Sequence, residues 1–288
     1  MSGPQQPGIV ASPHLHHRVS LAVLAVLTLG PVVWLAAVRP GDLVYYAIGG
    51  AAWAFAVAGK LLLARVRFAR RLMKAGVAGA GLWGLASGLA ELGVLAAIAS
   101  SGWLPLQLEV AAFCGLGAAG FEIVFILVAG AIEDYRHPDP DKLARWLAGA
   151  RRSLWVAYMG VIERIDATAL HVMTRIAVFD AMITEVWAPA LVALGLFALV
   201  DGAATYGAGR DWDWFEPRIC RAFYLAIFGG GPGGLGLCGA APGRRLSRGR
   251  QGAGGPRGLS RRSPRSGPPA RCAPAPAAYW AGRCRRAW

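Results

Sequence analysis

The sequence predicts an all-α fold, a polytopic transmembrane helix bundle of six to seven helices followed by a disordered basic C-terminal tail. Hydrophobic residues make up 56% of the 288 residues and charged residues only 16%, and the mean hydropathy is +0.44. Several apolar runs also exceed the roughly 20 residues that a helix needs to cross a bilayer. The lipid bilayer is therefore the expected surroundings of this chain.

The apolar runs give the expected elements in order. After the polar segment 1–18, the first run is longer than the core of a signal peptide and has no clear cleavage site behind it. We therefore expect a transmembrane bundle over 19–228, with spans at about 19–38, 43–63, 77–99, 110–132, 154–178 and 188–207. A seventh helix is expected to begin near Ile219, where the tail cuts it short.

The tail, 229–288, is rich in Gly, Pro and Arg and shows no apolar periodicity, which predicts disorder. It holds twelve of the 30 Lys and Arg residues and no acidic residue, which leaves 18 basic against 16 acidic residues elsewhere. A basic arm that binds anionic lipid or nucleic acid is one interpretation. We favour an out-of-frame reading of GC-rich DNA, because the apolar run RAFYLAIFG stops abruptly, and we expect no nucleic-acid partner.

Lys and Arg concentrate in the cytoplasmic connections of membrane proteins. Here they crowd the connections after the second and fourth expected spans, whereas segment 100–109 has none. This alternation predicts an integral, multi-pass protein of the inner or plasma membrane with a cytoplasmic N-terminus. Glycine motifs in the third and fourth spans, GLASG (84–88) and GLGAAG (115–120), predict close helix packing rather than ligand contact.

Ionisable residues interrupt the apolar runs, most densely in ERIDATALH (163–171). Each such group costs roughly 2.5–3.5 kcal/mol to insert, so a cluster of them indicates a functional site. Three other expected spans also carry a carboxylate. The candidate catalytic residues are Glu163, Glu122 and His171, and the candidate supporting residues are Arg164, Glu91 and Asp201.

Two chemical interpretations of this cluster stay open. In the first, a glutamate activates water as general base, and His171 either binds a divalent metal such as zinc or stabilises an oxyanion. In the second, the charges only form internal ion pairs, as Glu163 would with Arg164 or Arg175. Glu163 and His171 share a helix face but lie about 12 Å apart along the axis, so one metal ion cannot easily bind both. We expect His171 to pair with Glu91, and Glu163 with Glu122 or Arg164.

The segment ERIDATALHV resembles a motif of the YhfC family of membrane peptidases, in which ER is followed by a histidine two turns later. This family is related to the CAAX-protease and bacteriocin-processing membrane peptidases. Glu163, Arg164 and His171 match that motif. The resemblance covers roughly residues 60–206 and implies hydrolysis of peptide bonds by glutamate-activated water, with histidines at the site.

Three further segments resemble motifs of the same family but have lost part of them. GLGAAGFEIV is similar to a glycine-rich GxGHGGxE segment, in which Glu122 matches and Ala118 replaces a histidine. GLAELGVL keeps Glu91 from a paired-glutamate motif, and LFALVDG keeps Asp201 but has Phe197 in place of a histidine. Such a site, with fewer histidines, would bind zinc weakly.

Three hypotheses about function follow. The first is a YhfC-type peptidase that cleaves a membrane-associated peptide or protein substrate. The second is a non-catalytic membrane protein that binds or scaffolds a partner, with its remaining charges in ion pairs. The third is a proton-coupled carrier that uses the buried carboxylates.

Overall fold

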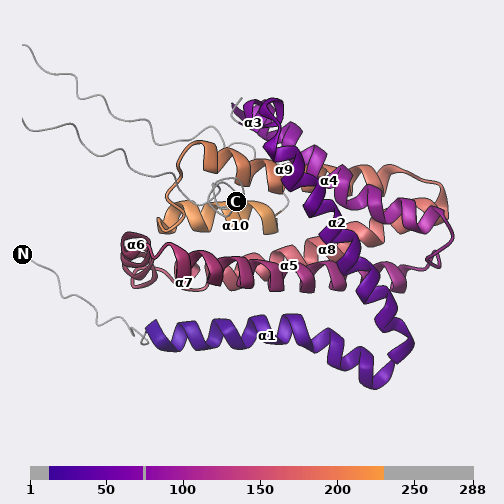
Figure 1. The fold of residues 1–288 in the computed structure, drawn as a ribbon, viewed down its shortest axis with the longest axis horizontal. Coiled ribbons are helices and arrows are strands. Elements are labelled where there is room, and N and C mark those ends of the chain that lie inside the picture. The colour runs from indigo at the N-terminus through magenta and orange to yellow at the C-terminus, as the bar shows by residue number, and fades with distance from the viewer. Residues whose placement is uncertain (1–12, 74–75, 230–288) are drawn as a thin grey trace, which may run out of the picture.

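A computed structural model describes residues 13–73 and 76–229, shown in Figure 1. Every regular element in these ranges is a helix. The expected disordered tail, apart from Gly229, lies outside the described residues. In chain order the elements are α1 (Pro13–Val38), η1 (Pro40–Asp42), α2 (Leu43–Arg65), α3 (Arg67–Met73), α4 (Gly76–Ser100), α5 (Leu108–Arg136), α6 (Pro140–Ala150), α7 (Leu154–Ala157), α8 (Met159–Thr184), α9 (Ala188–Gly209) and α10 (Pro217–Gly229).

Six of the described helices are long and apolar enough to cross a membrane, which confirms the expected all-α, multi-pass architecture. They are α1, α2, α4, α5, α8 and α9, and each overlaps one of the six predicted spans. The first begins earlier than predicted, inside the polar segment 1–18. The predicted seventh helix is α10, which begins two residues before Ile219; its 13 described residues measure about 20 Å.

The predicted span 154–178 differs most from the structure. The short helix α7 and the long helix α8 replace it, with a break at Tyr158, whose hydroxyl lies 2.7 Å from Nδ1 of His16 on α1. Helix α8 then continues past the apolar run, because Phe179 and Ala181 are fully buried. It ends at Thr184, and the next residue, Glu185, adopts a left-handed conformation with a φ of 59°.

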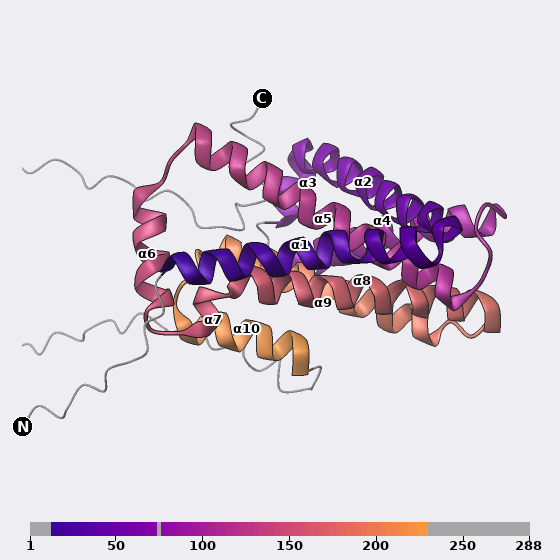
Figure 2. The ribbon, with the colours of Figure 1, turned by 90° about the horizontal axis from the view of Figure 1, so that it is seen from below.

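Helices α3 and α6 were not predicted because neither contains a long apolar run. Helix α6 is amphipathic, and its first turn is stabilised by Asp139, whose carboxylate accepts a hydrogen bond of 2.8 Å from the backbone N–H of Lys142. Figures 1 and 2 show α6 lying across one end of the bundle, whereas the long helices run along it. We call this end the basic end, because the end of α5, α6 and the turn after α6 carry Arg136, Arg145, Arg151 and Arg152.

The most extensive helix contacts join α4 with α9, α2 with α5 and α5 with α8. The predicted glycine packing is confirmed at these contacts. A Cβ atom on Gly84 would lie 2.5 Å from the carbonyl oxygen of Ala198 on α9, and one on Gly115 would lie 2.6 Å from Cα of Val172 on α8. Larger residues would separate these helices. The glycines therefore determine which polar side chains meet inside the bundle.

Helix α10 packs against α7 and α8 at the basic end. Cys220 and Tyr224 are buried there with Val156, and the Cys220 thiol donates a hydrogen bond of 3.5 Å to the carbonyl oxygen of Trp155. Burial raises the pKa of the Cys220 thiol to about 11. The cysteine is therefore a packing residue in the thiol form, because a reactive cysteine needs a depressed pKa.

Candidate functional site

Ionisable and hydroxyl side chains from five helices are joined by hydrogen bonds or ion pairs inside the bundle. We call this set the polar network. Its members are Lys60 on α2, Ser87 and Glu91 on α4, Glu122 on α5, Glu163, Arg164, His171 and Arg175 on α8, and Asp201 on α9. All six candidate residues from the sequence belong to it, so the structure brings them together.

Glu122 connects the two ends of the ERIDATALH segment. One of its carboxylate oxygens accepts a hydrogen bond of 2.5 Å from Nη1 of Arg164, and the other lies 2.5 Å from Nε2 of His171. Arg164 also donates from Nη2 to the carboxylate of Glu163, again at 2.5 Å. The two levels separated by about 12 Å on α8 are thus bridged through a residue of α5. The close approach of α5 to α8 at Gly115 makes this bridge possible.

The expected pairing of Glu163 with Arg164 is present, and Glu163 makes no ion pair with Arg175 among the described residues. The expected contact of His171 with Glu91 is also present, with 3.6 Å between Nδ1 and a carboxylate oxygen, but a shorter contact of 2.5 Å joins Nε2 of His171 to Glu122. Spacing along the sequence predicts how deep each ionisable side chain lies in the bundle. It does not predict how the imidazole of His171 is oriented between the two carboxylates.

Arg175 determines which tautomer His171 adopts. Its Nη1 lies 2.8 Å from Nδ1 of His171, and its Nη2 lies 3.4 Å from the carboxylate of Glu91. A guanidinium can only donate hydrogen bonds, so Nδ1 is the acceptor and Nε2 carries the proton that is donated to Glu122. Arg175 itself is 2% exposed. It follows His171 by four positions, so both side chains project from the same face of α8.

A second branch of the network joins α2, α4 and α9. The ammonium of Lys60 lies 2.6 Å from the carboxylate of Glu91 and donates a hydrogen bond of 3.0 Å to the hydroxyl of Ser87. Ser87 donates to the carboxylate of Asp201. Gly84 and Gly88 bring α4 against α9 next to this contact.

Sequence reasoning missed Lys60, Ser87 and the contact of Arg175 with His171. A signal for Lys60 was available, because it is the one charged residue in the expected span 43–63. Ser87 lies in GLASG, which we interpreted only as a packing motif, and its small hydroxyl gave no separate signal.

The network approaches the surface on the side of the basic end. The Glu163 side chain is 46% exposed, and it lies four residues after the start of α8. By contrast, the Glu91 and Glu122 side chains are only 3% and 14% exposed. Toward the opposite end, buried apolar side chains that include Leu95, Val110 and Phe179 close the bundle. The network therefore has an exposed carboxylate near one end and an apolar barrier at the other.

The residues present do not fit a zinc ion. Among residues 13–73 and 76–229, no group of three or more His, Cys, Asp or Glu side chains is placed to hold a metal. Both ring nitrogens of His171 already have polar partners. Ala118 packs with Trp53 and Val57. The Phe197 ring lies beside the His171 ring in a tilted contact. The two positions at which the resemblance to the YhfC family would imply histidines are thus apolar packing positions.

Two other polar features lie outside the network. Asp166 has one buried carboxylate oxygen with no hydrogen-bond partner in the described part of the chain.

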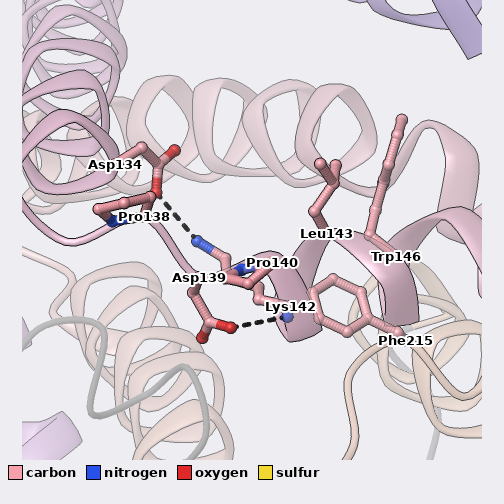
Figure 3. Close-up of a pocket in the computed structure, with 8 residues that line it drawn as sticks. All are labelled: Asp134, Pro138, Asp139, Pro140, Lys142, Leu143, Trp146 and Phe215. Carbon is pink, nitrogen blue, oxygen red and sulfur yellow. Dashed lines mark hydrogen bonds and ion pairs between the residues drawn. The ribbon is translucent and has the colours of Figure 1, made fainter.

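A cavity of about 610 Å³ lies beside α6, as Figure 3 shows, and none of its lining residues belongs to the network. The Lys142 ammonium in this cavity lies 3.4 Å from Asp134. This cavity is therefore not a binding site for a substrate of the network.

Comparisons with protein-family models, with curated proteins and with solved structures found no match for this chain. Its function is therefore inferred from the polar network.

Proposed function

We propose that this chain is a membrane peptidase of the YhfC type, which hydrolyses peptide bonds of membrane-associated substrates with Glu163 as general base. One observation carries this proposal. Glu163 is 46% exposed and is connected through Arg164 to Glu122, which is only 14% exposed. A general base must reach the proton that it abstracts, and an exposed carboxylate positioned by a neighbouring guanidinium is accessible to water. The resemblance of ERIDATALHV to the family motif points to the same residues.

In the proposed reaction, Glu163 accepts a proton from a water molecule while the water oxygen attacks the carbonyl carbon of the peptide bond. The carbon–nitrogen bond then breaks, and the proton passes from Glu163 to the leaving amine. Arg164 binds one carboxylate oxygen of Glu163 and leaves the other for water. Glu122 and His171 act as positioning residues, because their polar atoms bind each other, Arg164 and Arg175.

The substitution Glu163→Gln tests this proposal. Glutamine keeps the oxygen that Arg164 binds but cannot take a proton from water, so cleavage should fall by about 100-fold or more. The measurement is the appearance of shorter fragments from co-expressed single-span reporter proteins, alongside the amount of the peptidase itself. Glu109→Gln, an exposed change at the opposite end of the bundle, is the matched control. Full cleavage by both Glu163→Gln and His171→Ala would refute the assignment.

A proton-coupled carrier is the second candidate, favoured by the Lys60–Ser87–Asp201 branch. The network contains four carboxylates but only three Lys or Arg side chains, and Asp201 is bound by a hydroxyl and is in no ion pair among residues 13–73 and 76–229. Binding of one proton by a carboxylate would neutralise the excess negative charge of the network. Uptake that needs a proton gradient and disappears in Asp201→Asn would support this candidate. If neither cleavage nor uptake depends on the network, the scaffold hypothesis remains, with these charges as ion pairs.

We also propose that the N-terminus is cytoplasmic and that the protein lies in the inner or plasma membrane. The arginines of the basic end support this orientation, because the connection at the opposite end, 100–109, has no Lys or Arg. A cysteine introduced at the exposed Ser101 should react with a membrane-impermeant maleimide in intact cells. Reaction only after the cells are opened would reverse the orientation.

A further inference from the structure

We propose that the basic end holds a binding surface for the headgroups of anionic phospholipids in the surrounding bilayer. Its core is an arginine patch of five exposed residues from two segments. Arg145, Arg151 and Arg152 belong to α6 and the turn after it, and Arg218 and Arg221 belong to the start of α10. This inference does not depend on the proposed peptidase activity.

The two segments of the patch are in contact although they are far apart in the sequence. A Cβ atom on Gly149 of α6 would lie 2.5 Å from the carbonyl oxygen of Phe215, just before α10. Trp146 and Phe215 also pack around the same buried cluster as Cys220. The end of α6 and the start of α10 therefore present their arginines on neighbouring parts of the surface.

The charge around the five arginines is mostly of one sign. Residues 142–157 and 217–229 contain no Asp or Glu. The nearest acidic residues are Asp139 and Asp141 at the start of α6, and Asp211, Asp213 and the partly buried Glu216 before α10. Arginine is suited to lipid phosphates because its planar guanidinium can donate two parallel hydrogen bonds to phosphate oxygens. Basic residues close to a membrane surface are also attracted by the negative potential of anionic lipids.

Exposed leucines lie next to the arginines and indicate a bilayer rather than a water-soluble partner. Leu143, Leu154 and Leu225 are 57%, 66% and 50% exposed. Helix α6, which carries the first of them, is amphipathic and lies across one end of the bundle of long apolar helices (Figure 2). This is the position and composition of a helix in the membrane interface, with leucines toward the acyl chains and arginines at the phosphates.

The test is native mass spectrometry of the purified full chain, titrated with phosphatidylglycerol and, separately, with phosphatidylcholine. We expect wild type to prefer phosphatidylglycerol. The double substitution Arg145→Gln/Arg218→Gln should weaken phosphatidylglycerol binding by about fivefold per arginine and leave phosphatidylcholine binding unchanged. The twelve arginines after Gly229 are the same in every variant, so they cannot produce this difference.

Two controls separate the patch from general effects of charge or folding. Arg145→Lys/Arg218→Lys keeps both charges and should bind phosphatidylglycerol nearly as wild type does. Arg39→Gln removes one exposed charge at the opposite end and should change nothing. Equal binding of both lipids by wild type, or undiminished phosphatidylglycerol binding by the glutamine variant, would overturn the proposal. The proposal would also be overturned if a short RNA displaced phosphatidylglycerol from the patch at an RNA concentration lower than that of the lipid.

Discussion

Replacing Glu122 with alanine is expected to destabilise the bundle by about 3–5 kcal/mol, the usual cost of removing one partner from a buried ion pair. Glu122 is the carboxylate that contacts both Arg164 and His171, each at 2.5 Å. Without it, the Arg164 guanidinium, whose side chain is 8% exposed, keeps only Glu163 as a partner. The free energy of unfolding in mixed detergent micelles is the appropriate measurement.

Glu109→Ala is the matched control for this experiment, because Glu109 is an exposed carboxylate on the same helix. Its ion pair with Arg39 lies at the surface, where such pairs contribute about 0–1 kcal/mol. If Glu122→Ala costs no more than Glu109→Ala, Glu122 does not hold the network together.

Replacing Arg175 with methionine should have the second largest effect on stability, about 3 kcal/mol or more. Methionine roughly preserves the buried volume but removes the donor to Nδ1 of His171 and one of the two cations near Glu91. Arg151→Met, at an exposed position of the basic end, serves as the control. The measurement is again unfolding in mixed micelles.

A second substitution shows whether the lost stability comes from Glu91. In Arg175→Met/Glu91→Gln the carboxylate charge is also gone, so the double variant should be less destabilised than the sum of the two single variants. Strict additivity would mean that Arg175 stabilises the helix without acting on Glu91.

The membrane-spanning helices could be predicted because each is an apolar run of sufficient length, and length is set by the thickness of the bilayer. The limits of α8 could not, because Phe179 and Ala181 extend it through tertiary burial rather than through local hydropathy. Helix α6 escaped prediction for a related reason. It is short and half polar, and it lies at the end of the bundle, where no long apolar run is needed.

The residues of the candidate site could be predicted from the sequence, but the contacts between them could be predicted less well. An ionisable side chain inside an apolar run is visible in the sequence, so Glu122, Glu163 and His171 could be chosen before the structure. Their partners depend on which helices touch. That in turn depends on close approaches such as Gly115 against Val172, which place Glu122 beside His171. Lys60 differs from these residues, because a charged residue inside an apolar run is visible in the sequence and could have been included among the candidates.

Glu122 and Arg164 are expected to act as coupled members of one buried network. A double-mutant cycle of Glu122→Gln and Arg164→Met, measured as free energies of unfolding in mixed micelles, tests this claim most directly. The 2.5 Å contact predicts a coupling energy of about 2–3 kcal/mol between the two positions. Additivity within about 0.5 kcal/mol would contradict the network.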